Sequence, residues 1–282
     1  MNKGIFGNWY VKLRIRMPDK LVSLLKEIPL VARLAKSLQP RPGSVELYEL
    51  SEPLNGFRMF IPSNYVYTMV WGEYDPEVCR FLEGYLKPGW TVVDAGSHIG
   101  YFSLLMAKCV AQDGCVLSFE PLSENLCLLY NNIALNKMHE IIRVVPMAIA
   151  DRSHLCRLYY HQTSSQAFLE GTAEIDVSDK GYEVVAAVSL DEYMDAVGWP
   201  TVNLVKMDIE GAESLAVMGM KETLRRNSPA VLMETHGENA RQGLRYLAVE
   251  GYTVYKLERA GLREIHDLEN IVIANERWLL LP

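Results

Sequence analysis

The sequence lacks an apolar run long enough to cross a membrane. A transmembrane helix needs about 18 to 20 mostly apolar residues in a row, and no segment of this 282-residue chain reaches that length. The first residues, MNKGIFGNWYVKLRIRM, also lack the apolar core of a secretory signal, because charged residues are scattered through them. We therefore expect a cytoplasmic protein.

Disulfide and zinc motifs are missing as well. The chain has five cysteines, an odd number, and no two of them form a CxxC pair. Several of these cysteines lie in apolar runs. This pattern favours reduced, buried thiols over disulfides or a structural zinc site.

Basic charge is scarce outside the first segment of the chain. The net charge is −7, yet residues 1–41 carry nine Lys or Arg against two acids. The rest of the chain is therefore acidic and lacks the basic footprint that a phosphate backbone requires, so we expect no nucleic-acid substrate. The basic leader, residues 1–43, predicts an amphipathic helix from about Asp19 to Leu38. This helix either packs on the body or contacts a membrane surface or an acidic partner.

What the chain does contain, beyond the leader, is an alternation of strands and helices. Residues 44–75 predict a short β extension with strands VELYEL, GFRMFIP and VYTMVW around a turn at Asn55-Gly56. Residues 76–282 predict one α/β domain with a mostly parallel sheet and helices on both faces. Its expected strands are 91–94, 115–120, 141–148, 204–208, 230–234, 252–257 and 270–275, the last as an antiparallel edge strand. Its expected helices are 76–86, 99–110, 123–136, 189–197, 211–226 and 237–250, the fourth opened by a capping box, Ser189-x-x-Glu192.

A dinucleotide fingerprint is absent from the first strand–helix turn of this domain. The stretch TVVDAGSHIGYFSLLMA has Asp94, Gly96 and Gly100, but His98 and Tyr101 occupy the remaining glycine positions of GxGxxG. An acid at the strand end would repel a pyrophosphate. It suits a ligand with an ammonium group and no phosphate, such as S-adenosylmethionine, and a glycine allows the backbone to approach that ligand closely.

Several spaced motifs resemble the FkbM family of S-adenosylmethionine-dependent methyltransferases. They are VVDAGSHIGYFSLLMA, SFEPLSENLCLLYNNIALN, VVPMAIAD, VSLDEYM, NLVKMDIEGAESLAVMGM and VLMETH, and the resemblance as a whole extends from about Tyr74 to the final strands near Asn275. The resemblance implies a class I methyltransferase with a Rossmann-like sheet of seven strands, the last inserted antiparallel. It also implies methylation of a hydroxyl oxygen on a small molecule, natural product or sugar. His98 departs from the family pattern, and the leader lies outside the resemblance.

The strand ends supply the predicted cofactor contacts. Glu120, which ends the second core strand, is placed to accept hydrogen bonds from the ribose hydroxyls. The full predicted set is Asp94, Ala95, Gly96, Ser97, His98, Gly100, Glu120, Pro121, Ala148 and Asp208.

The predicted catalytic residues, His236, Asp208 and Glu210, follow two neighbouring strands. His236 is the first choice for a general base because imidazole titrates nearest neutral pH, although it could equally cap the next helix. Asp208 could hold the methionine ammonium, orient His236 or bind a cation, and Glu210 could contact the acceptor. Asp208, Glu234 and His236 could instead form a divalent-metal site. Glu213 is expected in the first turn of the next helix, where the helix dipole favours an acid.

Residues 151–188 are too long for a plain connection, and we expect them to cover the acceptor site. Ser164 and Ser165 in this insertion, with Glu73 and Tyr74 before the first core helix, are the predicted acceptor contacts. Two alternatives from other classes stay open. One is an NAD(P) oxidoreductase on a similar sheet, which the failed glycine pattern disfavours. The other is a non-catalytic cofactor-binding module. The sequence names neither the acceptor nor the oligomeric state.

Overall fold

The computed structural model of the chain describes residues 43–70, 72–160, 167–172, 181–268, 270, 273 and 275–282. The helix predicted in the basic leader and the predicted acceptor contacts Ser164 and Ser165 lie outside these residues. The chain divides into an N-terminal unit, Met1–Pro76, and a C-terminal unit, Glu77–Pro282. Within the described ranges, no helix combines the length and the apolar character that a bilayer crossing demands.

The N-terminal unit contains the predicted β extension. Strands β1 (Val45–Glu49) and β2 (Arg58–Pro62) pair as an antiparallel hairpin, as the sequence predicted. The third predicted strand, VYTMVW, is wrong, because a short helix, α4 (Val66–Met69), replaces it. Its two buried residues, Val66 and Met69, are three positions apart and so share one side of a helical turn.

The C-terminal unit is built on a large sheet with the predicted topology. Its described strands follow the order β13 (Gly261–Glu264), β12 (Thr253–Glu258), β14 (Glu276–Leu281), β11 (Ala230–Thr235), β10 (Leu204–Met207), β3 (Thr91–Ala95), β4 (Cys115–Phe119) and β5 (Ile142–Val145). Pairing is parallel from β11 to β5, and β14 is antiparallel to both of its neighbours. The class I methyltransferase sheet with an antiparallel last strand is therefore confirmed.

Three details of this sheet differ from the strands read off the sequence pattern. The last strand, β14, lies inside the sheet between β11 and β12, as the family resemblance implied, and not at its edge. The strand predicted at 270–275 includes 271, 272 and 274, which lie outside the described residues, and β14 begins at Glu276. β13 adds an eighth strand, which the sequence did not signal because all four of its residues are exposed and show no alternation.

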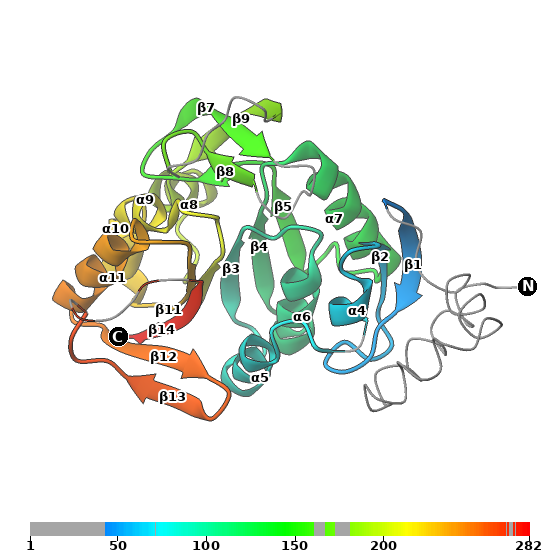
Figure 1. The fold of residues 1–282 in the computed structure, drawn as a ribbon, viewed down its shortest axis with the longest axis horizontal. Helices are drawn as coiled ribbons and strands as arrows, with labels where there is room; N and C mark the ends of the chain where they lie inside the picture. The colour runs from blue at the N-terminus through cyan, green and yellow to red at the C-terminus, as the bar shows by residue number, and fades with distance from the viewer. Residues whose placement is uncertain are drawn as a thin grey trace, which may run out of the picture. The chain divides into compact units, whose positions relative to one another are not determined.

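Helices cover both faces of the large sheet (Figure 1). On one face α6 (Tyr101–Val110) packs against β3, β4 and β5. The opposite face carries Val93, Leu117 and Val205, which form one core with α8 (Leu190–Val197), α9 (Glu213–Met218), α10 (Lys221–Asn227) and α11 (Ala240–Val249). The other helices of the unit are α5 (Pro76–Tyr85) and α7 (Ser123–Leu135). The predicted capping box of Ser189 and Glu192 opens α8 and is confirmed.

Backbone chemistry explains two further corrections to the predicted elements. The strand predicted over 141–148 is split into β5 and β6 (Ala148–Ile149) around Pro146, which has no N–H to donate to a ladder. The helix predicted over 211–226 is broken at Gly219 into α9 and α10. A Cβ at Gly219 would collide with the carbonyl oxygen of Ala150, so the chain turns where only glycine fits.

The insertion at 151–188 folds into three strands that form a second sheet together with β6. β6, β9 (Gly181–Val188), β7 (His154–Tyr160) and β8 (Ala167–Leu169) form a second sheet in that order. Its buried residues Leu158 and Val185 share a core with Leu122 and Ala212, which follow β4 and β10. Figure 1 shows this small sheet beyond the upper ends of β3 and β4. The insertion therefore packs over the strand ends.

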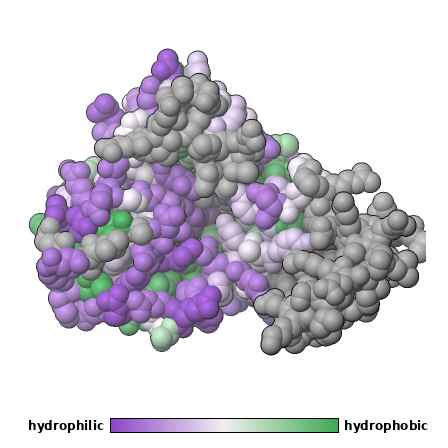
Figure 2. All heavy atoms as spheres, viewed as in Figure 1, coloured by the Kyte–Doolittle hydropathy of each residue, from purple (hydrophilic) through white to green (hydrophobic). Residues whose placement is uncertain are grey.

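On the face drawn in Figure 2, the described surface is mostly hydrophilic, in agreement with the amino-acid composition of a globular protein. Figure 2 shows that hydrophilic residues cover most of the described surface on this face, with small hydrophobic patches between them. The most exposed apolar residues of the insertion are Leu155, Tyr182 and Val184 on β7 and β9. All five cysteines are free, as predicted, but the prediction that they are buried holds for Cys79 alone, since Cys127 is exposed and the other three are half-buried.

Candidate functional site

The ends of four parallel strands bring the predicted site residues to one edge of the sheet. β4, β3, β10 and β11 are successive neighbours, so the segments that follow them emerge side by side. These segments begin at Gly96, Glu120, Asp208 and His236.

The loop after β3 lies directly against the loop after β10. Gly96 has a φ of 81°, and a Cβ at this position would collide with the carbonyl oxygen of Asp208. The Asp208 amide also donates a 3.0 Å hydrogen bond to the carbonyl oxygen of Ala95. Glycine is therefore required at 96, and the predicted cofactor loop and Asp208 are held next to each other.

Asp94 is buried beneath this loop. Its side chain is fully buried, accepts a 2.6 Å hydrogen bond from the Ser103 hydroxyl, and lies 3.4 Å from the Lys206 ammonium. Ser97 also turns inward, where its hydroxyl donates to the Asp94 carbonyl oxygen. Direct contact between the Asp94 carboxylate and the cofactor stays a prediction, because the partners it has in the structure support the loop from below.

Glu120 presents a buried carboxylate at the end of β4. Its Oε2 accepts a 2.8 Å hydrogen bond from the His98 amide, and its Oε1 accepts from the Leu122 amide and the Asn125 side chain. Burial raises the pKa of Glu120 to about 7 against these hydrogen bonds, which favour the charged form. A carboxylate oxygen has two lone pairs, so Oε2 can accept a further bond and fits the predicted ribose contact.

His98, the departure from the family pattern, is a neutral ring at physiological pH. Its backbone is left-handed, with a φ of 51°. Burial lowers the pKa of His98 to about 4, with the Asp208 carboxylate opposing that shift and the Lys206 ammonium adding to it. The imidazole therefore brings no charge to the cofactor loop.

Lys206 links the two loops and was missed by the sequence analysis. Its ammonium is 3.4 Å from Asp94 and 3.8 Å from Asp208 Oδ2, and it lies over the ring of Phe102 at 4.9 Å. Burial opposes the charged form, but Asp94 and Asp208 outweigh it and raise the pKa of Lys206. A lysine inside the apolar strand NLVKM was the available signal.

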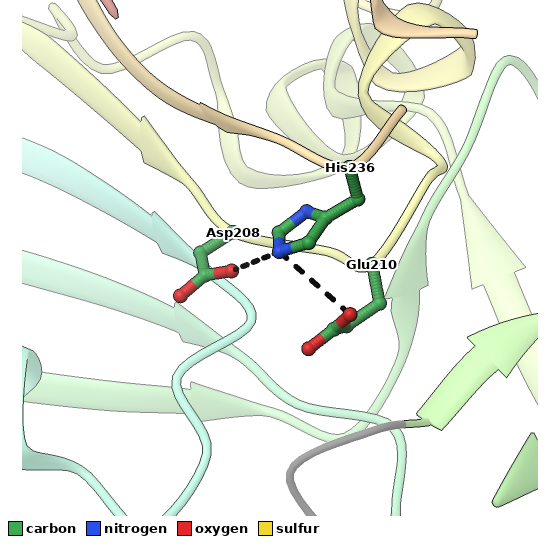
Figure 3. A group of neighbouring side chains, drawn as sticks. All are labelled: Asp208, Glu210 and His236. Carbon is green, nitrogen blue, oxygen red and sulfur yellow. Dashed lines mark ion pairs between the residues drawn. The ribbon is translucent and has the colours of Figure 1, made fainter. Parts of the chain in front are cut away.

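The predicted catalytic residues meet in one cluster, which we call the acceptor cluster: Asp208, Glu210 and His236. Figure 3 shows their side chains pointing toward one another from the loops after β10 and β11. His236 Nε2 lies 3.6 Å from Asp208 Oδ1 and 3.7 Å from Glu210 Oε2. Each side chain keeps part of its surface exposed, between 15% and 32%. The cluster is therefore open to a ligand.

Glu213 fixes the ring of His236 from behind. It stands at the start of α9, as predicted, is fully buried, and its Oε1 lies 2.8 Å from His236 Nδ1 and 3.0 Å from the Gly211 amide. Burial alone would lower the pKa of His236, but the bond to Glu213 and the charges of the cluster raise it to about 9. Burial also raises the pKa of Glu210 to about 7, with His236 opposing it.

Glu234, a predicted metal ligand, faces another partner. Its carboxylate pairs with Arg277 at 3.3 Å. Among the residues that the structure describes, the group that could hold a metal ion is Asp208, Glu210 and His236, whose ligand atoms lie within 4.8 Å of one another. The predicted set is corrected accordingly, with Glu210 in the place of Glu234.

The insertion touches both loops of the acceptor cluster through Thr172. Its carbonyl oxygen accepts a 2.7 Å hydrogen bond from Asn239, and a Cβ at Gly211 would lie only 2.9 Å from that oxygen.

Two predicted cofactor residues, Pro121 and Ala148, lie beside Glu120 and in β6, respectively. Glu73 and Tyr74, two of the predicted acceptor contacts, belong to the N-terminal unit, and their role stays a prediction.

A family model described as the methyltransferase FkbM domain matches residues 94–267. This match includes the loop after β3, the insertion and the acceptor cluster. It confirms the predicted methyltransferase fold with S-adenosylmethionine as its cofactor. No curated protein matches the chain.

Several solved methyltransferases are similar to this chain at low identity. A methyltransferase FkbM from Methylobacillus flagellatus KT is 16% identical over 72% of this chain, with a TM-score of 0.47, and this chain spans about half (47%) of its length. An O-methyltransferase from Bacillus cereus, solved with SAH, is 11% identical over 74% of this chain and 82% of its own, with a TM-score of 0.45. An S-adenosylmethionine-dependent O-methyltransferase from Thermotoga maritima is 13% identical over 88% of this chain and 80% of its own, with a TM-score of 0.41.

Proposed function

Because the chain belongs to the FkbM methyltransferase family, we propose that it transfers the methyl group of S-adenosylmethionine to a hydroxyl oxygen of a small molecule, natural product or sugar. One observation carries this proposal. Gly96 brings the cofactor loop into backbone contact with Asp208, the first residue of the acceptor cluster. A methyl donor on that loop would have titratable side chains within reach of its acceptor.

The reaction is an in-line displacement. A lone pair of the acceptor oxygen forms the new bond to the methyl carbon while the carbon–sulfur bond breaks. The electron pair of the broken bond stays on sulfur, which gives S-adenosylhomocysteine. The hydroxyl proton must leave the acceptor oxygen. Alignment of oxygen, carbon and sulfur lowers the barrier, and the cofactor loop and the insertion would supply that alignment.

The acceptor cluster is the proposed place where the hydroxyl is activated. His236 Nε2 faces away from Glu213 and toward Asp208 and Glu210, and in the neutral ring it can accept the hydroxyl proton. With a pKa raised to about 9, the neutral ring becomes abundant only at alkaline pH. The second way to activate a hydroxyl is a cation in the same cluster.

The acceptor would enter between the cluster and the insertion. Thr172 already joins the insertion to both loops of the cluster. Ser164, Ser165, Glu73 and Tyr74 are the proposed further acceptor contacts. A cytoplasmic location, and contact of the basic leader with a membrane surface or an acidic partner, also stay proposals.

The test is methyl transfer from S-adenosylmethionine labelled in its methyl group to a library of hydroxylated acceptors. We expect labelled methyl ethers and S-adenosylhomocysteine in equal amounts. Binding of the cofactor without transfer to any acceptor would favour the non-catalytic module. Tighter binding of NAD than of S-adenosylmethionine would favour the oxidoreductase.

A further inference from the structure

The acceptor cluster has the donor atoms of a cation site. One imidazole nitrogen and two carboxylate oxygens, from His236, Asp208 and Glu210, all lie within 4.8 Å of one another. They come from two loops that the neighbouring strands β10 and β11 hold in place, and they point at a common space (Figure 3). Nitrogen and oxygen ligands of this kind suit first-row divalent cations.

His236 is oriented in the way that metal-bound histidines are. The fully buried Glu213 carboxylate accepts the Nδ1 hydrogen at 2.8 Å, which leaves the Nε2 lone pair of the neutral ring facing Asp208 and Glu210. A carboxylate behind the imidazole fixes the tautomer and makes the free nitrogen a stronger ligand. Glu213 is itself held by the Gly211 amide. This arrangement is independent of the two acids in the cluster.

Asp208 is held from its other side. Lys206 lies 3.8 Å from Oδ2, whereas Oδ1 is the oxygen that faces His236. The buried ammonium therefore occupies one carboxylate oxygen and leaves the other for a ligand. Because Lys206 also pairs with Asp94, its charge is shared, and the cluster with Glu213 keeps an excess of negative charge that favours a cation.

The donor atoms lie close enough together for side-chain rotation to bring them around one ion. Nitrogen and oxygen ligands lie about 2.0–2.2 Å from such a cation, which places neighbouring ligand atoms about 3.0–3.4 Å apart. Nε2 is 3.6 Å and 3.7 Å from the two carboxylate oxygens. All three donor atoms lie within 4.8 Å of one another, so rotation of the partly exposed carboxylates toward Nε2 would close the site around one ion.

We propose that Asp208, Glu210 and His236 bind one divalent cation of the Mn²⁺ to Zn²⁺ series, with positions left open for the acceptor oxygen. This deepens the proposed function, on which its role in activation rests. Such a cation would make a bound acceptor hydroxyl lose its proton to solvent more readily, and the acceptor oxygen would then form its bond to the methyl carbon as the carbon–sulfur bond breaks. With the cation present, Nε2 is a ligand and not the base.

The experiment uses the full-length protein after treatment with EDTA. Binding of Mn²⁺ is measured from the electron paramagnetic resonance signal of the free ion during titration, and binding of Zn²⁺ is measured by calorimetry in a separate titration. We expect one ion per chain. Glu210→Gln and His236→Ala should each weaken binding at least tenfold, and Glu213→Gln roughly 10- to 100-fold. Glu234→Gln, an acid on the same strand end that is paired with Arg277, is the matched control and should bind as the wild type does.

Absence of a bound ion with both metals, or equal binding by wild type and Glu210→Gln, would overturn the proposal. Unchanged secondary structure in each variant, measured by circular dichroism, separates lost ligands from lost folding. The ion-binding test and the methyl-transfer test can fail independently of each other. Ion binding without methyl transfer would leave the cation site standing and refute the transferase, whereas EDTA-resistant transfer without ion binding would do the reverse.

Discussion

The two sides of the site differ in how far the fold has already satisfied their polar groups. The cofactor side, residues 94–100 and 120–122, holds its carboxylates Asp94 and Glu120 buried and bonded to neighbouring hydroxyl, ammonium and amide groups. The acceptor cluster holds Asp208, Glu210 and His236 partly exposed, with Nε2 beyond ordinary hydrogen-bond distance from both acids. One side is completed by the fold, and the other is left for a ligand.

This difference implies that cofactor binding and catalysis depend on separate residues. Changes on the cofactor side should alter stability and cofactor affinity, because those side chains support the loops themselves. Changes in the acceptor cluster should alter turnover. Lys206 is the connection between the sides, since its ammonium lies close to both Asp94 and Asp208.

The largest expected effect is a loss of turnover when a side chain of the acceptor cluster is removed. His236→Ala should lower kcat roughly 10²- to 10⁴-fold, because the hydroxyl loses its activating group. The measurement is the rate of S-adenosylhomocysteine formation with a saturating acceptor. Glu238→Ala, an exposed acid two residues further on, is the control and should keep the wild-type rate. Full activity of the His236 variant would remove the cluster from the mechanism.

The second-largest expected effect is a loss of folding stability when a buried carboxylate of the cofactor side is neutralised. Asp94→Asn should reduce the free energy of unfolding by roughly 3–5 kcal/mol, because the buried Lys206 loses one of its two carboxylate partners. Urea denaturation measures this change. Glu83→Gln, which breaks the half-exposed pair with Lys108, is the matched surface control and should cost no more than about 1 kcal/mol. Similar losses in both variants would show that Asp94 has no special supporting role.

The pH dependence of stability tests the electrostatics of the acceptor cluster. The folded pKa of His236, about 9, is raised above its usual 6.5, so the stabilisation is complete below pH 6.5 and is lost as the pH rises through 9. The loss should be at most roughly 3.5 kcal/mol, at about 1.4 kcal/mol per pKa unit. Urea midpoints in EDTA from about pH 6 to about pH 10, a range that brackets the usual and the folded pKa of His236, measure it. The same slope in His236→Asn would assign the loss to another group.

A smaller effect is expected on cofactor affinity when Glu120 is neutralised. Glu120→Gln should weaken binding of S-adenosylmethionine about tenfold, because a charge-assisted hydrogen bond becomes a neutral one while the shape is kept. Calorimetric titration gives the affinity. Glu183→Gln, a change in an exposed carboxylate that bonds Ser123, should leave it unaltered. Unchanged affinity in the Glu120 variant would place the ribose elsewhere.

Where apolar strands alternate with helices, the sequence predicted the fold well. β3, β4, β10 and β11 were found within a residue or so of their bounds, since each is a short apolar run ending in a polar residue. The insertion was read as a covering loop, although LCRLYY and YEVVAAV have strand-forming composition. α4 was misread because β-branched and aromatic residues favour strands, and burial of Val66 and Met69 overrode that preference.

The candidate site was predicted in part for the same reason. The proximity of Asp208, Glu210 and His236 could be predicted because strand ends meet at one edge of a parallel sheet, whereas their catalytic role stays a prediction. The partnership of Glu213 with His236 was not found, because it joins residues 23 positions apart and depends on side-chain directions. The burial of Asp94 under Lys206 depends on cross-strand register, which pairs these two residues on the face that α6 covers.

The most direct test of the separation between the two sides is the affinity for S-adenosylmethionine of a double variant, Glu210→Gln with His236→Ala. Calorimetric titration of the full-length protein measures it. We predict a dissociation constant within about threefold of the wild type, a difference below roughly 0.7 kcal/mol. Binding weakened tenfold or more would contradict the separation and would show that the acceptor cluster also holds the cofactor.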